Sequence, residues 1–193
     1  MPGFEYIGKE ELKSLNNLFK KDRAILFAHG FEKIRKRFHV REFEKLSAKK
    51  MKSKFALAVT SGTSATKIGL KALGVKPGDE VITQGFNFIA TIEAILDVGA
   101  KPILCNVDET LNMCPKDLKK IITKKTKAIV PVHMLGVPCE MEQILKIARS
   151  NKLKVLEDNC ESMGAKYNNK YLGTLGNVGA VSYDFGKTIT CGE

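Results

Sequence analysis

Short apolar runs alternate with amphipathic segments along most of this chain, and that alternation constrains the fold more than any other feature. The runs have the length of single buried strands, and the segments between them repeat apolar residues at the spacing of a helix. Connections of only a few residues join the two kinds of segment. The pattern predicts βαβ units: a mostly parallel sheet with helices on both faces, which is a three-layer αβα arrangement of the α/β class.

The expected boundaries follow from where each periodicity starts and stops. The predicted strands are Phe55–Thr60, Glu80–Thr83, Pro102–Val107, Lys127–Val132, Leu153–Glu157 and the β-like run Gly179–Tyr183. The predicted helices are Lys9–Lys21, Val40–Met51, Ser61–Leu73, Phe88–Val98, Pro115–Ile122 and Met141–Asn151. The stretch Asp22–Phe38 is basic and irregular. We therefore expect an N-terminal helical segment over residues 1–52 and an α/β domain over residues 53–193.

The amino-acid composition excludes several classes of protein and ranks the possible partners. A length of 193 residues with 44% hydrophobic side chains is enough for a real core, which excludes disordered, collagen-like and disulfide-scaffold chains. The net charge of +11 is scattered along the chain. We interpret it first as a solvated surface, second as a preference for an acidic ligand and third as a nucleic-acid surface. Because no aromatic–basic RNA-recognition motif occurs, we expect no nucleic-acid partner.

Cysteine usage and hydropathy indicate the compartment. The cysteines form no C-x-x-C pair and no disulfide framework, which suits a reducing environment. No apolar run approaches the length of a membrane span, and Met1–Leu12 has no signal-peptide core. We expect a cytoplasmic protein that does not contact a membrane. All five cysteines are interpreted as small core residues: Cys105, Cys114, Cys139, Cys160 and Cys191.

Ligands of parallel α/β sheets bind beyond the carboxyl ends of the strands, and Ser61–Ser64 is the first polar cluster predicted there. A glycine turn followed by a helix N-terminus offers free N–H groups and a positive dipole end, which suit a phosphate. The hydroxyls of Thr63 and Ser64 would add hydrogen bonds. The alternative is an ordinary N-cap, because serine and threonine are favoured at that position in any helix.

The second cluster, Glu157–Glu161, follows another predicted strand. The partner of a carboxylate such as Asp158 would be a metal, a ribose hydroxyl or a protonated ring nitrogen, and a helix N-cap is the alternative. A metal is disfavoured, because the three histidines lie far apart in sequence and no Cys/His cluster exists. Cys160 is a poor candidate nucleophile, since the neighbouring acidic residues disfavour its thiolate.

The third cluster, Ser182–Lys187, ends in a lone lysine. The run Gly186-Lys187-Thr188 resembles the end of a P-loop, but six residues separate Gly179 from Gly186 where that motif needs four. A nucleoside triphosphatase is therefore excluded. No G-x-G-x-x-G occurs either, so a nicotinamide Rossmann site is not expected.

The three clusters are more informative together than apart. They occur in order along the chain, with the aromatic pair Phe86 and Phe88 between the first and the second. Pyridoxal 5′-phosphate needs donors for its phosphate, an anion for its pyridine nitrogen, an aromatic group for its ring face and an amine for its aldehyde. The sequence offers all four.

Six ordered motifs make the chain resemble the DegT/DnrJ/EryC1/StrS sugar aminotransferases, a branch of the fold-type I pyridoxal-phosphate enzymes. They are Ser61–Ala65, Phe86–Thr91, Gly99–Pro102, Pro131–Gly136, Glu157–Glu161 and Ser182–Thr188. The resemblance spans essentially the whole chain. It implies that residues 53–193 are an incomplete cofactor-binding large domain and that the smaller C-terminal domain is absent, because family members are much longer and continue beyond the position of Glu193.

The resemblance also implies the roles of individual residues. Lys187 would hold the cofactor aldehyde covalently, and Asp158 would hold the pyridinium nitrogen. The implied phosphate and ring contacts are Gly62, Thr63, Ser182 and Phe88.

Some positions depart from the family pattern or carry two interpretations. Glu161 stands where many relatives have a glutamine that contacts the ring hydroxyl, and an ionised glutamate would repel a phenolate oxygen there. His133 lies near the cofactor in the family, but a structural histidine is an equally good interpretation. Phe86 is interpreted as a core residue. Tyr183 and Cys191, where relatives often have phenylalanine and threonine, are expected to be packing changes.

The activity implied by the resemblance is transfer of an amino group, from glutamate, to a nucleotide-linked ketosugar for polysaccharide or secondary-metabolite synthesis. A neighbouring branch removes a sugar hydroxyl instead, shares a stretch like Asp158-Asn159-Cys160, and has histidine in place of the lysine. Lys187 therefore favours transamination. Family active sites lie at a homodimer interface, so the 193-residue chain alone is expected to be an inactive cofactor-binding fragment.

Overall fold

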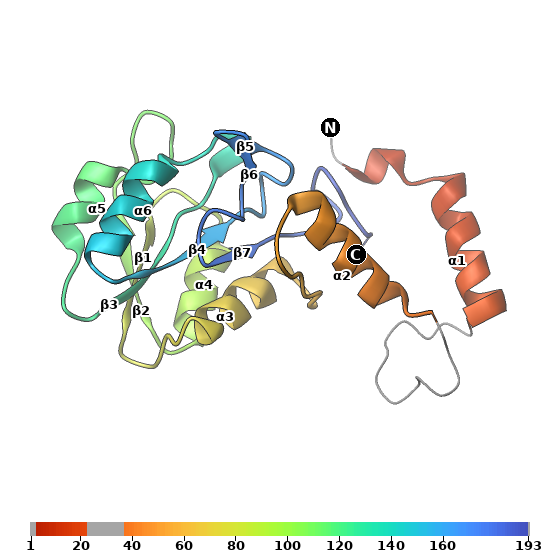
Figure 1. Cartoon of the computed structure of the whole chain (residues 1–193), viewed down its shortest axis with the longest axis horizontal. Coiled ribbons are helices and arrows are strands. Elements are labelled where there is room, and N and C mark those ends of the chain that lie inside the picture. Colours follow the sequence, from red (N-terminus) through yellow and green to blue (C-terminus); the bar gives the residue numbers. More distant parts are fainter. Residues whose placement is uncertain (1–2, 23–36, 193) are drawn as a thin grey trace.

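A five-stranded parallel sheet forms the centre of the protein. The computed structural model describes residues 3–22 and 37–192 (Figure 1). The strands of the sheet are β1 (Glu80–Gln84), β2 (Lys101–Cys105), β3 (Thr126–Val130), β4 (Lys154–Asp158) and β7 (Val178–Ala180). They lie in the order β2-β1-β3-β4-β7, and every neighbouring pair is parallel. A separate antiparallel hairpin joins β5 (Lys166–Tyr167) to β6 (Lys170–Tyr171).

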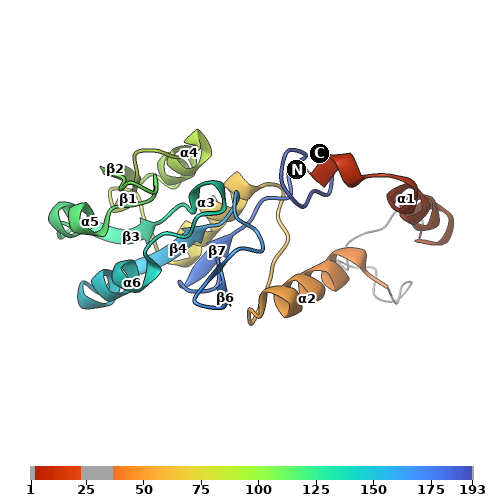
Figure 2. The same cartoon turned by 90° about the horizontal axis from the view of Figure 1, so that it is seen from above.

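Helices cover both faces of this sheet, so the predicted three-layer αβα arrangement is correct. The layers contain α3 (Gly62–Ala72) and α4 (Ile89–Asp97) on one face and α5 (Pro115–Ile121) and α6 (Met141–Ser150) on the other. Figure 2 shows α4 and α6 on opposite sides of the strands. A short 3₁₀ turn, η2 (Met134–Gly136), lies between β3 and α6.

The strand sequences explain the two cores, because successive side chains of a strand point to opposite faces. Ile82 of β1 belongs to the core beneath α5 and α6, whereas the preceding Val81 belongs to the core beneath α3 and α4. Val155 and Leu156 of β4 divide in the same way. A strand buried on both faces must be apolar at nearly every position, which is why these strands appear as continuous apolar runs.

The predicted strand Phe55–Thr60 is wrong. This segment has no strand pairing, and the side chains of Phe55 and Leu57 are 78% and 73% exposed. The Ala58 N–H donates instead to the Glu44 carboxylate, at 2.9 Å. An apolar run shows that burial would be favourable, but a strand also needs a neighbouring backbone, and no described strand lies beside this segment.

Two helices and a 3₁₀ turn precede the α/β part: η1 (Gly3–Tyr6), α1 (Lys9–Asp22) and α2 (His39–Met51). Figure 1 shows α1 and α2 to one side of the sheet. Both helices were expected from apolar spacing, although Leu12, Leu15 and Phe19 of α1 are exposed. Most of the stretch predicted as irregular, Asp22–Phe38, lies outside the described residues. Within the described ranges, no helix is long and apolar enough to cross a membrane.

Close backbone packing at Gly179 gives a first prediction. A Cβ at this position of β7 would overlap the backbone of Gly173. We expect Gly179→Ala to lower the free energy of unfolding by about 1–3 kcal/mol, because Gly179 is paired with Glu157 in the sheet and the Gly173 N–H is bonded to the Glu157 carboxylate, so neither backbone can move freely. The matched control is Gly85→Ala, where the nearest atom to a new Cβ is the Cys105 carbonyl oxygen at 3.7 Å. Urea unfolding measures both, and equal stability of the two variants would contradict this packing argument.

Candidate active site

The N-terminus of α3 is capped by Ser61, as the N-cap interpretation predicted. Ser61 has an extended backbone, and its Oγ accepts a hydrogen bond from the Ser64 N–H at 3.0 Å. Thr60 Oγ1 lies 3.0 Å from Ser64 Oγ, so the hydroxyls of the turn bond to one another. Helix geometry leaves the N–H groups of Gly62 and Thr63 without intrahelical acceptors. The cap and an anion site are therefore compatible in the same turn.

Gly62 lets two other segments approach this helix end. A Cβ on Gly62 would lie 2.9 Å from Cys160 Sγ and 3.0 Å from Ser182 Cβ. The residues of three separate sequence clusters thus meet at one place, beyond the carboxyl ends of β4 and β7. This is where parallel α/β sheets bind their ligands.

Asp158 is the last residue of β4 and is only 6% exposed. Its Oδ2 accepts a hydrogen bond from Thr91 Oγ1 at 2.7 Å, and its Oδ1 accepts one from the Cys160 N–H at 3.1 Å. Turns follow β4 directly, so the alternative that Asp158 caps a helix is wrong. The carboxylate is a buried anion held in one orientation by two donors.

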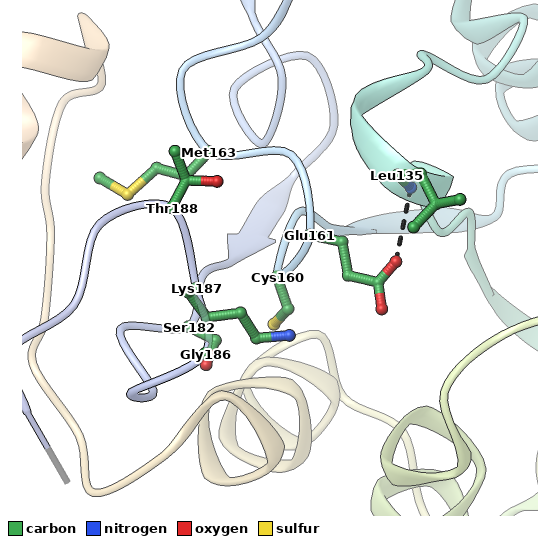
Figure 3. Close-up of a pocket in the computed structure, with 8 residues that line it drawn as sticks. All are labelled: Leu135, Cys160, Glu161, Met163, Ser182, Gly186, Lys187 and Thr188. Carbon is green, nitrogen blue, oxygen red and sulfur yellow. Dashed lines mark hydrogen bonds between the residues drawn. The ribbon is translucent and has the colours of Figure 1, made fainter. Parts of the chain in front are cut away.

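A cavity of about 240 Å³ opens beside these groups (Figure 3). Its lining residues are Leu135, Cys160, Glu161, Met163, Ser182, Gly186, Lys187 and Thr188. Lys187 reaches into it from the loop after β7, and its Nζ lies 6.0 Å from the centre of the Phe88 ring. The cavity therefore brings together an amine, a hydroxyl and a carboxylate.

That carboxylate belongs to Glu161, which Figure 3 shows pointing toward η2. Its Oε2 accepts a hydrogen bond from the Leu135 N–H at 3.4 Å. Leu135 has a left-handed backbone, with a φ of 51°. The Glu161 carboxylate thus lies at the cavity wall, where the sequence placed it, and one of its oxygens already has a backbone partner.

His133 is a structural histidine. Its side chain is fully buried and does not line the cavity. Its Nδ1 accepts a hydrogen bond from the Cys139 N–H at 3.1 Å, so its Nε2 carries the proton and donates to Glu157 Oε2, also at 3.1 Å. Of the two interpretations of this residue, the structure supports the structural one.

The sequence interpretation missed the role of Glu157. This fully buried carboxylate accepts hydrogen bonds from three backbone N–H groups, those of Gly173 at 2.9 Å and of Leu175 and Gly176 at 2.6 Å each. With His133 it has four donors. The available signal was a glutamate inside an apolar strand, since an ionisable side chain is rarely fully buried without partners.

The uniform interpretation of the cysteines is wrong. Cys105 and Cys139 are buried, and burial raises the pKa of each thiol to about 12. Burial and the neighbouring Asp158 also raise the pKa of the Cys160 thiol, but this residue lines the cavity. Cys114 is half-buried and Cys191 is exposed. All five are free thiols.

The expectation for Phe86 is wrong as well. Its side chain is 48% exposed, in the bend that follows the carboxyl end of β1, where no described strand or helix covers it. In residues 3–22 and 37–192, no group of three or more His, Cys, Asp or Glu side chains is arranged to hold a metal ion.

Comparison with known proteins identifies the family. The model of the DegT/DnrJ/EryC1/StrS aminotransferase family matches residues 22–193. The chain belongs to this family. It is 44% identical over 156 residues to GDP-perosamine synthase of Escherichia coli O157:H7, a match that covers 80% of this chain and 43% of that protein.

Solved structures of the family confirm the fold-type I architecture. The aminotransferase from Psychrobacter cryohalolentis superposes with a TM-score of 0.87 at 34% identity, over 95% of this chain and 45% of that one. The E. coli GDP-4-keto-6-deoxy-D-mannose-3-dehydratase with bound hydrated PLP gives 0.83 at 31% identity, over 95% and 46%. The chain thus spans less than half the length of the proteins it matches.

The partners of Glu157 give a prediction for this family member. Glu157→Gln places an amide NH₂ group against N–H donors and leaves at least one of them without an acceptor. We expect the free energy of unfolding to fall by about 2–4 kcal/mol. Urea unfolding measures the loss, and Glu142→Gln on the exposed face of α6 is the matched control. A Glu157→Gln variant as stable as the control would contradict the assigned hydrogen bonds.

Proposed function

We propose that the protein is a pyridoxal-phosphate-dependent aminotransferase that transfers an amino group from glutamate to a nucleotide-linked ketosugar. The observation that carries this proposal is the position of Lys187, whose amine reaches into a cavity beside the α3 N-terminus and near the ring of Phe88. GDP-perosamine synthase, the relative named above, supports a nucleotide sugar as the substrate class. The product would be an amino sugar for a polysaccharide or a secondary metabolite.

The residues present fit the cofactor. The unbonded N–H groups of Gly62 and Thr63 and the hydroxyl of Ser182, which lies against Gly62, would hold its phosphate. The buried Asp158 carboxylate would hold its ring nitrogen, and Phe88, 64% exposed, would stack on the ring. When bound, pyridoxal phosphate supplies an electron sink for the carbanion that transamination requires.

Lys187 has two tasks in this proposal. Its Nζ would hold the cofactor through the aldehyde and, when an amino donor takes its place, would be free to act as a base. In that role the amine would accept the proton from the Cα of the donor and, now protonated, would serve as the proton donor for the second half of the transfer. The Lys187 side chain is half-buried among the lining groups of the cavity.

Asp158 keeps the ring nitrogen protonated. A unit charge pair at hydrogen-bond distance contributes on the order of 4 kcal/mol at an effective dielectric constant near 20. The donors from Thr91 and Cys160 keep the carboxylate in place, so little reorganisation is needed when charge develops. Glu161, held by the Leu135 N–H, would face the ring hydroxyl from the cavity wall, where an ionised carboxylate would repel a phenolate oxygen.

The remaining parts of the proposal concern the surroundings of the site. Leu135 lines the cavity and the Phe88 ring lies near Lys187, and both apolar side chains are exposed, which supports a homodimer that covers them. Five free thiols support a cytoplasmic location. The expected division into a helical segment over residues 1–52 and a large domain over residues 53–193 stays a prediction.

The dehydratase is the second candidate, because a sugar dehydratase is among the similar structures. The discriminating feature is Lys187, since removal of a hydroxyl in that branch proceeds with histidine at this position. Mass spectrometry of the sugar product separates the two reactions: transamination replaces a carbonyl oxygen with an amine, whereas dehydration removes a hydroxyl.

Covalent trapping tests the attachment. Protein incubated with pyridoxal phosphate and reduced with borohydride should carry one label, on the peptide that contains Lys187. Lys187→Ala should lose both this label and the visible absorption of the Schiff base. Lys154→Ala, whose exposed side chain lies at the opposite end of β4, should keep both. Unchanged labelling of Lys187→Ala would refute the assignment.

A second variant tests the electron sink. We expect Asp158→Ala to retain part of its cofactor affinity but to convert glutamate to 2-oxoglutarate at least about 100-fold more slowly, because the ring nitrogen loses its counter-charge. Single-turnover release of 2-oxoglutarate measures this. A rate equal to that of the unchanged protein would exclude Asp158 from the role.

A further inference from the structure

The hydroxyl of Thr91 makes a hydrogen bond that crosses between layers of the fold. Thr91 lies in the first turn of α4, and its Oγ1 donates to Asp158 Oδ2 at 2.7 Å, joining residues 67 positions apart. Both side chains are buried, at 2% and 6% exposure. We propose that Thr91 is a positioning residue that orients the Asp158 carboxylate toward the cofactor nitrogen, an inference that rests on the proposed function.

A second buried threonine makes a different hydrogen bond and serves as a comparison. Thr66 of α3 is also 2% exposed, and its Oγ1 donates to the Gly62 carbonyl one helical turn back, at 3.2 Å. That is the ordinary partner of a helical threonine. Thr91 directs its hydroxyl to another element instead. The two residues are therefore equally buried and both helical, but their hydroxyls have different acceptors. Thr66 bonds to its own helix and Thr91 bonds to Asp158.

The turn that carries Thr91 is itself held at the sheet. Asn87 Nδ2 donates to the Gln84 carbonyl at 2.6 Å and to Thr83 Oγ1 at 3.3 Å. Thr83 Oγ1 in turn donates to the Val130 carbonyl at 2.9 Å. The start of α4 is thus fixed to the carboxyl ends of β1 and β3, so the hydroxyl has a defined position from which to orient Asp158.

The same turn carries Phe88, three residues before Thr91. Its ring lies 6.0 Å from Lys187 Nζ, on the cavity side of α4. One helical turn therefore places the aromatic group for the ring face and orients the anion for the ring nitrogen. Phe88 and Asp158 would both contact the same planar cofactor. The position of one relative to the other therefore determines how well the ring is held.

Asp158 has one fixed donor on each oxygen, Thr91 on Oδ2 and the Cys160 N–H on Oδ1. Thr91→Val keeps the shape of the side chain and removes one donor. The buried carboxylate then has a single donor and can rotate about its χ angles. Thr91→Ser keeps the donor, and Thr66→Val removes a hydroxyl of the neighbouring helix as a matched control.

Cofactor affinity is the first measurement. We expect Thr91→Val to weaken pyridoxal-phosphate binding by about tenfold, while Thr91→Ser and Thr66→Val stay within about twofold of the unchanged protein. Absorbance titration gives these affinities. Equal losses in Thr91→Val and Thr66→Val, or no loss in a folded Thr91→Val, would overturn the proposal. Failure of the unchanged protein to bind at Lys187 would instead refute the proposed function.

A double-mutant cycle in the cofactor-free protein tests the same contact without the cofactor. Thr91→Val should lower the equilibrium constant for folding by about tenfold in the unchanged background but by less than about twofold beside Asp158→Ala. Urea unfolding of the four proteins gives the coupling. Additive effects would show that Thr91 does not act through Asp158 and would overturn the inference.

Discussion

The hydrogen bonds to the buried carboxylate of Glu157 are the interactions on which the site most depends. Three backbone N–H groups of residues 173–176 and the ring of His133 converge on it at the end of β4. These bonds attach the loop before β7 to the sheet, and His133 attaches the segment before α6 through the Cys139 N–H. A buried carboxylate is costly unless it is hydrogen-bonded, and the loss of any one of these donors would destabilise it. The end of β4 is therefore rigid where the next residue, Asp158, must be held.

The alternation of side chains along a strand gives the two neighbouring carboxylates, Glu157 and Asp158, different partners. Successive side chains of β4 point to opposite faces of the sheet, so Glu157 and Asp158 meet different surroundings. Glu157 bonds to loop backbone and to His133, whereas Asp158 bonds to Thr91 of α4. Glu157 thus bonds two loops to the sheet, whereas Asp158 is held by one side-chain donor from α4 and by the Cys160 N–H.

Local patterns in the sequence were enough to predict the layers, the capped start of α3 and the polar residues at the strand ends. They failed where the outcome depended on a distant partner. Phe55–Thr60 is apolar but has no described strand beside it, and Phe86 is exposed in the bend after β1. The donors to Glu157 are 16 to 24 residues away, and the Thr91–Asp158 bond joins positions 67 apart. Periodicity contains no information about such pairs, because it describes only which face of its own element a residue occupies.

The position of Lys187 depends on yet another distant segment. Lys187 lies on a loop after β7, outside the sheet, so strand pairing does not hold it. The Gly3 N–H donates to the Lys187 carbonyl at 2.7 Å, and the rings of Phe4 and Phe185 lie 6.0 Å apart. A Cβ on Gly3 would come within 2.7 Å of the Thr188 carbonyl oxygen, so this close approach requires glycine. The sheet thus fixes the anion, and the N-terminal turn helps to fix the amine. The geometry of the site therefore joins the two parts of the chain that the sequence pattern separates.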